Sequence, residues 1–395
     1  MQTIVSNSFD ETKGTLEIGV AERVDSTNSQ IFDEEIQTLV KDKEIKSIRF
    51  NLKDTVYVSS AGLRVFLKYA KVYKDSSLVE VNPEVYDVLD MTGFKSFYHV
   101  ERKLKHYTID GLEIIGRGAT GVVYRIDRDT IIKVFNENCS TEVIKHEMAL
   151  SKEAFTHGIT TAIPYEVVRV GNRYGTIYEL IQSETLSQIL HNSGDQFDEV
   201  AKKYGRFMHE MNQIDVGDTV FPSTFDTYGK MKWLANSRAS EDVKAIYNDL
   251  FDSIPNKNTY IHGDFHPKNV MAMGDDLILI DMGESSHGHP IFDVMSLGCL
   301  YLALVEVPEA CVNFIGLEPK ELERLWNKFL SAYFSCDDEE QLKHINNVCL
   351  LYSTIRAVPI LVGLPNYPEE SKVKVINKIK ELYNDKANRD LSIFD

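Results

Sequence analysis

Hydrophobic and polar positions follow two different periods in the first hundred residues. Period-two alternation at residues 16–18 and 48–52 is typical of half-buried β-strands. Hydrophobic residues spaced three and four apart predict helices over 31–40 and 61–73, and a third helix after Pro83. Strands and helices that interleave over this length predict a small α/β sandwich.

The pattern changes near residues 101–106, which form a charged stretch. This change predicts a first domain at residues 1–103 and a second at 104–395. Beyond residue 300 the pattern is helical, and core packing explains two stripes there. The stripes are Leu322, Leu325, Trp326, Phe329 and Leu330, then Val373, Ile376, Ile379, Leu382 and Tyr383.

Composition narrows the class of protein. Of the 395 residues, 43% are hydrophobic and 26% are charged, the balance of a soluble globular chain. A net charge of −17 argues against a nucleic-acid-binding face. The N-terminus lacks a signal-peptide pattern, and the longest apolar run, 294–305, is too short to span a bilayer. We therefore expect a cytoplasmic protein that binds neither nucleic acid nor membrane.

A strand runs directly into a helix at residues 57–63, where Ser59 and Ser60 carry free hydroxyls. A serine at such a junction caps the first turn of the helix. The open helix N-terminus also favours an anionic group such as a phosphate. Capping alone is the simpler interpretation.

Several blocks of the first hundred residues together resemble a STAS domain, the family of anti-sigma factor antagonists. The blocks lie at 23–28, 48–52, 59–65, 81–83 and 89–94. The resemblance implies a docking or regulatory module that binds a protein partner and whose helix-start serine is phosphorylated by a kinase. Ala61 stands at the usual phosphoserine position, so Ser60 is the nearest candidate phosphosite and phosphorylation-independent docking is the alternative.

A glycine motif, Gly116-x-Gly118-x-x-Gly121, lies between two strand-like segments. A dinucleotide-binding fingerprint requires a helix after the glycines, and a Walker A loop requires Lys-Ser/Thr where Val122 stands. The motif therefore predicts a β-hairpin whose glycine tip lets backbone N–H groups approach phosphate. An ordinary turn is the alternative.

Lys133 lies within an apolar strand, where a lysine needs an anion unless it faces water at a sheet edge. The helix that comes next offers Glu147 as its partner, with Glu142 as the competing choice. Residues 176–180 form an apolar strand that turns polar at Glu179, as expected of a linker between two lobes whose backbone meets an adenine edge.

Asp264, Asn269 and Asp281 are the oxygen donors of the segments 260–270 and 277–284. Phosphoryl transfer needs a base for the acceptor hydroxyl, hard oxygen ligands for magnesium and a cation on the phosphates. Asp264 suits the base, and Asn269 and Asp281 suit the metal. A zinc site is the alternative, although glycine and proline within the segment disfavour the helix it requires. It would use His262, His266, His287 and His289.

The motifs His-Gly-Asp-Phe-His-Pro-Lys-Asn (262–269) and Ile-Asp-Met-Gly-Glu (280–284), with the glycine loop and Lys133, resemble the aminoglycoside phosphotransferase and choline kinase branch of the protein-kinase-like fold. The resemblance spans about residues 107–300. It implies a two-lobed domain, with a β-rich N-lobe at about 104–181 and a helical C-lobe at about 182–395, and the cofactors ATP and magnesium.

The resemblance also implies residue roles. Asp264 and Lys133 are catalytic, Asn269 and Asp281 bind magnesium, and Asp293 buttresses the catalytic loop. The nucleotide-binding residues are Gly116, Gly118, Gly121, Val123, Lys133, Glu147 and Glu179.

The acceptor is predicted to be a hydroxyl group of a small molecule. His266 stands where Ser/Thr protein kinases commonly have lysine, and the short segment between Asp281 and Asp293 lacks Ala-Pro-Glu and leaves little room for a peptide platform. Two alternatives stay open: a Ser/Thr protein kinase of a partner-switching pathway, and a non-catalytic nucleotide-binding scaffold. The intact set of polar residues argues against the scaffold.

Overall fold

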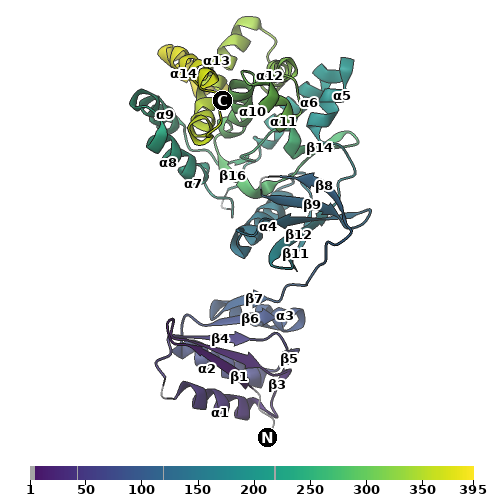
Figure 1. Cartoon of the computed structure of the whole chain (residues 1–395), viewed down its shortest axis with the longest axis vertical. Coiled ribbons are helices and arrows are strands. Elements are labelled where there is room, and N and C mark those ends of the chain that lie inside the picture. The colour runs from purple at the N-terminus through teal and green to yellow at the C-terminus, as the bar shows by residue number, and fades with distance from the viewer. Residues whose placement is uncertain (1–4, 42, 119, 218) are drawn as a thin grey trace. The chain divides into compact units, whose positions relative to one another are not determined.

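The computed structural model describes all residues except 1–4, 42, 119 and 218, and the chain divides into two compact units, 1–107 and 108–395 (Figure 1). Each unit buries its own hydrophobic core. A functional boundary at residues 103 and 104 remains our proposal.

The first unit is built on a mixed five-stranded sheet of order β1-β2-β4-β6-β7, in which only the β1–β2 pair is antiparallel. Its strands are β1 (Val5–Asp10), β2 (Thr15–Val20), β4 (Ser47–Asn51), β6 (Ser77–Val81) and β7 (His99–Arg102). The short parallel strands β3 (Arg23–Val24) and β5 (Tyr57–Val58), the helices α1 (Ser29–Val40), α2 (Ser60–Val72) and α3 (Pro83–Met91), and the 3-10 helix η1 (Phe94–Ser96) complete it.

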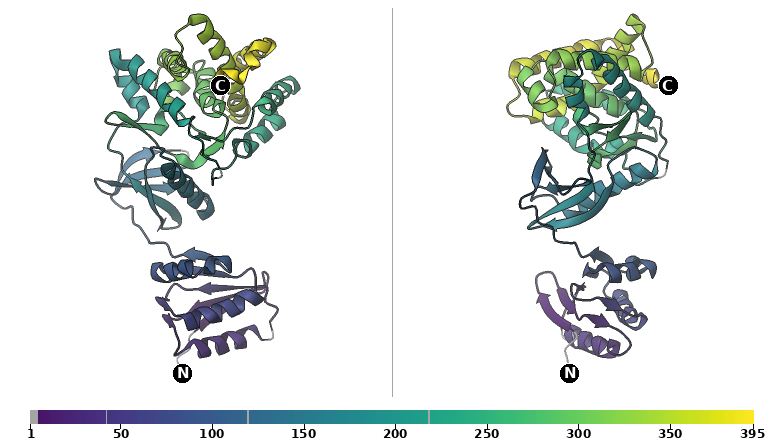
Figure 2. Two further views of the ribbon diagram at one scale, coloured as in Figure 1. Left: turned by 180° about the vertical axis from the view of Figure 1, so that it is seen from behind. Right: turned by 90° about the vertical axis from the view of Figure 1, so that its right-hand side faces the viewer.

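The predicted alternation decides which face of this sheet is covered. Ile18 and Phe50 are fully buried, whereas Glu17 and Arg49 point to the open face and form a 3.9 Å ion pair there. The buried side of the sheet faces the helices (Figure 2), and the ring of Phe66 on α2 packs there edge-on against Phe50 at 5.0 Å. The predicted strands and helices of this unit are confirmed.

The charged stretch is not simply a linker. Its first residues, Glu101 and Arg102, belong to the edge strand β7, and Lys103 N still donates to Val81 O at 2.8 Å. Backbone hydrogen bonds to β6 thus continue into the charged stretch, where the sequence pattern did not predict a strand.

The second unit begins with an antiparallel five-stranded sheet of order β11-β12-β10-β9-β8 and one long helix, α4 (Thr141–Thr156). Its strands are β8 (Glu113–Arg117), β9 (Gly121–Arg125), β10 (Thr130–Phe135), β11 (Pro164–Val170) and β12 (Arg173–Glu179). Strands β8 and β9 pair directly, which confirms the predicted hairpin at the glycine motif.

The rest of this unit is mainly helical (Figure 1). Its helices are α5 (Leu186–Asn192), α6 (Phe197–Met211), α7 (Thr224–Thr227), α8 (Gly229–Arg238), α9 (Glu241–Ser253), α10 (Ile291–Leu304), α11 (Pro308–Ile315), α12 (Pro319–Tyr333), α13 (Glu339–Gly363) and α14 (Glu369–Asn384). Short strands lie between α9 and α10: β13 (Thr259–Ile261), β14 (Val270–Met273), β15 (Asp276–Leu279) and β16 (Ser286–Gly288). The 3-10 helices are η2 (Gly194–Gln196), η3 (Pro267–Asn269), η4 (Met282–Glu284), η5 (Lys386–Arg389) and η6 (Leu391–Phe394).

Helices α10 and α13 form the centre of this helical part. A side chain at Gly298 of α10 would collide with the Ser353 hydroxyl of α13, so the glycine permits their close approach. By length and composition α13 alone among the described helices could cross a membrane, but 72% of its apolar window is buried within the fold. Such burial is typical of a core helix.

The two predicted C-terminal stripes fare differently. All five residues of the first are buried on α12. On α14 the buried apolar positions are Val375, Ile379 and Leu382, whereas Val373 is 49% exposed. The prediction for Val373 was wrong because the helix turns its other apolar positions toward the core.

Candidate active site

Lys133 lies at the centre of the strand sheet, on β10 between β9 and β12. Its Nζ lies 2.8 Å from Glu147 Oε1 and 3.0 Å from Asp281 Oδ1. Burial disfavours its charge, but the two carboxylates outweigh burial and raise the pKa of Lys133 above its usual value. The lysine is therefore a permanent cation.

Glu147, and not Glu142, is the partner of this lysine. Glu147 lies on the buried side of α4, with its side chain 8% exposed, and Tyr178 Oη donates to its Oε1 at 3.1 Å. Glu142 is exposed in the first turn of the same helix. The five-residue separation rotates the two side chains to different faces of the helix.

The glycine motif needs its glycines for different reasons. A Cβ at Gly121 would collide with the backbone carbonyl of Val134 on β10, so packing within the sheet requires this glycine. The space beside Gly118 is open, and its N–H donates to Gly121 O at 2.9 Å. Ala119, between them, lies outside the described residues. Contact between this loop and phosphate stays a prediction.

Every nucleotide- and metal-binding residue predicted from the sequence lines one cavity of about 630 Å³. These residues are Gly116, Gly118, Gly121, Val123, Lys133, Glu147, Glu179, Asn269 and Asp281. Apolar side chains, among them Ile131, Ala162 and Ile280, line the cavity as well. An apolar site with a few convergent polar groups is typical of a small-molecule or cofactor site.

The loop between β13 and η3, residues 262–266, is the predicted catalytic loop, and Asp293 at the start of α10 holds it in place. Asp293 is fully buried: its Oδ1 accepts from Gly263 N at 2.8 Å, and its Oδ2 from His262 N at 3.0 Å and from Asn212 Nδ2 at 2.9 Å. Burial nonetheless raises the pKa of Asp293. Gly263 has a φ of +82°, and a Cβ at this position would collide with the Glu284 carbonyl, so the loop requires glycine here.

Asp264 lies in this loop with both carboxylate oxygens engaged. Asn269 Nδ2 donates to Oδ2 at 3.1 Å, His266 Nε2 lies 3.5 Å from Oδ2, and Arg356 Nη2 donates to Oδ1. Burial favours the protonated form, but the adjacent His266 imidazole and the charge of Arg356 hold the pKa of Asp264 well below its usual range. The carboxylate is ionised at neutral pH.

The donor set fits magnesium. The amide nitrogen of Asn269 is bound to Asp264, which leaves the amide oxygen for a cation. Asp281 has a φ of +64°, a left-handed conformation that is uncommon for residues other than glycine and that clusters at active sites and ligand-binding segments. Carboxylate and amide oxygens are ligands that magnesium prefers. Among the described residues no group of three or more His, Cys, Asp or Glu side chains is arranged to hold a metal, which argues against the zinc alternative.

Sequence reasoning missed Arg356, which α13 brings to Asp264 from 92 residues further along the chain. No motif surrounds it. The available signal was a single charge within the mainly apolar segment 348–362, because a lone charge in a buried helix needs a partner.

The predicted phosphosite region in the first unit is accessible. The Ser59 side chain caps α2 by accepting from Ala61 N at 3.2 Å, as predicted, and Ser60 is exposed at the first position of the helix. Phosphorylation of Ser60 stays a prediction.

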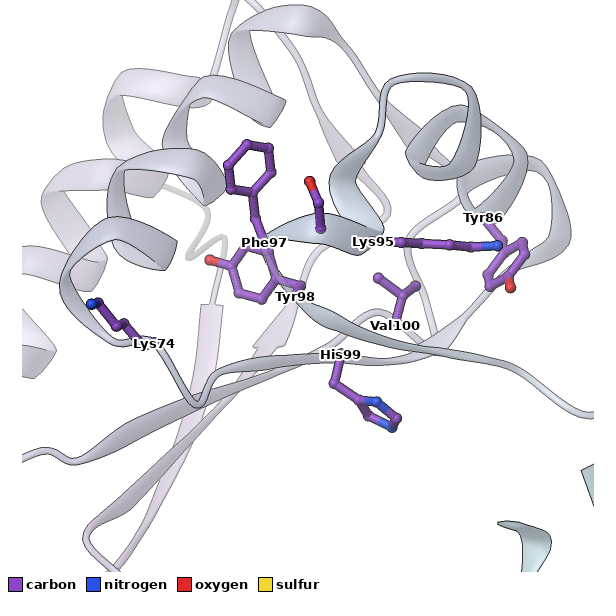
Figure 3. A pocket seen from close by; sticks show the side chains of 8 residues that line it. Lys74, Tyr86, Lys95, Phe97, Tyr98, His99 and Val100 are labelled. Carbon is purple, nitrogen blue, oxygen red and sulfur yellow. The ribbon is translucent and has the colours of Figure 1, made fainter. Parts of the chain in front are cut away.

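A hollow of about 450 Å³ lies elsewhere on the first unit, around η1 and β7 (Figure 3). Lys95 lies over the Tyr86 ring, at 4.5 Å from its centroid, and pairs with Asp90 at 2.8 Å. His99 and Lys74 add further polar groups to its rim. The sequence patterns had not indicated this feature.

Two family models match the chain. Residues 111–310 match the phosphotransferase enzyme family, and residues 8–106 match the STAS domain. No curated protein is similar enough in sequence to count as a match. The family matches confirm both predicted resemblances and support phosphotransferase activity for the second unit.

Similar solved structures are kinases of small molecules by their names. One is amicoumacin kinase hAmiN in complex with AMP-PNP, Ca²⁺ and Ami, with 15% identity, a TM-score of 0.48, and 75% of this chain and 93% of that chain covered. Another is a choline/ethanolamine kinase family protein from Mesorhizobium loti, with 16% identity, a TM-score of 0.46, and 72% and 92% covered. At these TM-scores they carry no argument about function.

Proposed function

We propose that this chain, which belongs to the phosphotransferase enzyme family, transfers the γ-phosphate of ATP to a hydroxyl group of a small molecule, with magnesium as its metal. The STAS domain is a regulatory or docking module in this proposal. One observation supports it most strongly: Lys133 Nζ lies 2.8 Å from Glu147 Oε1 and 3.0 Å from Asp281 Oδ1. All three residues line one cavity, together with Asn269. Residues far apart in sequence thus supply a cation and oxygen donors to one place.

Each polar group has a role suited to its surroundings. Lys133 binds phosphate oxygens while Glu147 holds its ammonium in place. Asn269 and Asp281 hold magnesium, which when bound neutralises the charge that develops during transfer. The hairpin at Gly118 covers the phosphates, because the open space beside this glycine allows the backbone to approach them closely.

Asp264 orients the acceptor hydroxyl and takes its proton. As the acceptor oxygen bonds to the γ-phosphorus, the bond from that phosphorus to the bridging oxygen breaks and ADP leaves. The proton of the hydroxyl passes to the Asp264 carboxylate. A carboxylate with a low pKa suits this task, since phosphoryl transfer depends more on positioning and charge than on a strong base.

The short connection from Asp281 to α10 favours a small acceptor. The chain forms η4 and β16 and then enters α10 at Ile291. Strand β16 pairs with β13 immediately before the catalytic loop. Residues 281–291, all of which the structure describes, therefore offer no long segment on which an extended peptide could lie.

The test uses radiolabelled γ-phosphate ATP with magnesium and a panel of sugars, amino alcohols, nucleosides and aminoglycosides. We expect label on one class of small molecule, and Asp264→Asn should lower turnover roughly 10²–10⁴-fold, the range of a general base. Label on the protein that Ser60→Ala abolishes would instead support the protein-kinase alternative. ATP binding without any transfer would support the scaffold. Near-normal turnover of Asp264→Asn would remove Asp264 from its role.

A further inference from the structure

Arg356 makes three hydrogen bonds through its terminal nitrogens, two of them to the catalytic loop. Nη2 donates to Asp264 Oδ1, and Nη1 donates to the carbonyl of Gly263 and, at 3.1 Å, to Tyr228 Oη. The guanidinium therefore joins α13 to the side chain of the candidate base and to the backbone of the residue before it.

The charge of Arg356 is buried, with its side chain 14% exposed. Of the groups it contacts in the described part of the chain, only Asp264 is ionised at neutral pH, because burial raises the pKa of Tyr228 to about 12. The nearby thiol of Cys299 is also neutral, since burial raises its pKa to about 12. A buried cation with one counter-charge in contact is tied to that partner.

Hydrogen bonds engage both oxygens of the Asp264 carboxylate. A carboxylate offers about four lone-pair sites. Arg356 occupies one at Oδ1, and Asn269 and His266 lie at Oδ2. A carboxylate held at both oxygens does not rotate, so its remaining lone pairs keep a fixed direction.

We propose that Arg356 is a positioning residue. It holds the Asp264 carboxylate in the one orientation from which this carboxylate takes the proton of the substrate hydroxyl. This inference rests on the proposed function, because it assigns Asp264 the role of receiving the proton of that hydroxyl. Arg356 touches neither phosphate nor acceptor and acts through Asp264. Its planar fork suits the task, since Nη1 and Nη2 engage the backbone and the carboxylate together.

The kinetic test compares Arg356→Met with Arg206→Met, an exposed arginine on α6 that serves as the matched control. We expect Arg356→Met to lower kcat roughly 10²-fold, the cost of a small misplacement of a reacting group, with the KM for ATP nearly unchanged. Arg356→Lys should recover part of the loss and added methylguanidine should recover part of it in Arg356→Met. Magnesium-dependent ATP hydrolysis is the readout until an acceptor is found.

A double-mutant cycle separates positioning from a structural role. In an Asp264→Asn background, Arg356→Met should change kcat less than about 3-fold, because residues that act as a unit are not additive. An undiminished effect in that background would overturn the proposal. So would a raised KM for the acceptor with kcat retained, which would make Arg356 an acceptor-binding residue. If Arg356→Met does not fold, Tyr228→Phe is a milder second variant, because it removes only one contact of Arg356. We expect it to lower kcat by a smaller factor.

A structural readout keeps this inference separate from the proposed function. In crystals of Arg356→Met the Asp264 carboxylate should turn away from its 3.1 Å contact with Asn269 Nδ2. An unmoved carboxylate would overturn the positioning role even if the wild-type chain proved inactive. An inactive wild-type chain with a displaced carboxylate in the variant would overturn only the proposed function.

Discussion

The candidate site has a strand side, formed by the sheet β8–β12 with α4, and a helical side, formed by the elements from α5 onward. Each side holds a largely buried cation, but the two cations have different partners. Lys133 on β10 contacts two carboxylates, of which Asp281 is 45% exposed to the cavity. Arg356 on α13 contacts one carboxylate and a backbone carbonyl, both in the catalytic loop. A lysine shared between partners is able to exchange one of them for phosphate, whereas the arginine is committed to the loop.

This difference teaches how one site combines binding with rigidity. Lysine carries a compact charge on a flexible stem, and arginine a planar fork that fixes its partners. The strand side thus suits a ligand that enters and leaves. The helical side suits a carboxylate that must keep its direction.

Of the two cations, Lys133 should have the larger effect on turnover when it is removed. We expect Lys133→Met to lower kcat roughly 10²–10³-fold, as for the loss of one group that stabilises transition-state charge. The KM for ATP should also rise, unlike in Arg356→Met. Steady-state kinetics with varied ATP measures both changes, and an unchanged KM would remove the contrast between the two cations.

Glu147→Gln should have a smaller effect, with Glu142→Gln as its matched control on the same helix. Glu147 holds Lys133 at 2.8 Å, whereas Glu142 is exposed. We expect Glu147→Gln to lower kcat/KM for ATP roughly 10-fold, about the loss of 1.4 kcal/mol, and Glu142→Gln to leave it unchanged. Equal effects of the two substitutions would contradict the assigned pairing.

Two glycines of the hairpin separate packing from ligand contact on the strand side. Gly121→Ala should destabilise the fold by roughly 1–3 kcal/mol, because its Cβ would press on the Val134 backbone. Gly118→Ala should change stability by less than about 0.5 kcal/mol, since its surroundings are open. Denaturant unfolding measures the free energy of unfolding of both variants. A Gly121→Ala variant as stable as the wild type would show that the hairpin shifts to accommodate the added Cβ.

The helical side should also respond to pH through His289, just before α10. Burial and the charge of Lys257 lower the pKa of this imidazole to about 4, against about 6.5 in an unfolded chain. The unfolded chain therefore binds the proton first, and stability is full above about pH 6.5 and falls as the pH drops toward 4. The loss is at most roughly 3 kcal/mol. Thermal unfolding at pH 7 and 4.5 measures it, and His289→Asn should reduce the slope; an equal slope would exclude this histidine as its source.

Much of the strand side was predictable because its signals are local. The hairpin was predicted from three glycines between apolar runs, and Lys133 from a charge within an apolar strand. The choice of Glu147 over Glu142 depended on the rotation of α4 about its axis, which apolar spacing only suggested. The positive φ of Asp281 had no counterpart in the sequence pattern, since glycine is the usual residue for that conformation.

By itself, the sequence determined the two domain types and the order of the strands and helices around the motifs, and it predicted the candidate oxygen donors, because all of these depend on neighbours a few residues apart. Tertiary structure decided which distant side chains meet. The packing of α13 against α10 brings Arg356 to Asp264 across 92 residues, and Asn212 of the loop after α6 meets Asp293 across 81. Such pairs leave no periodic trace, since the energy of a buried polar group depends on the groups that the fold places beside it.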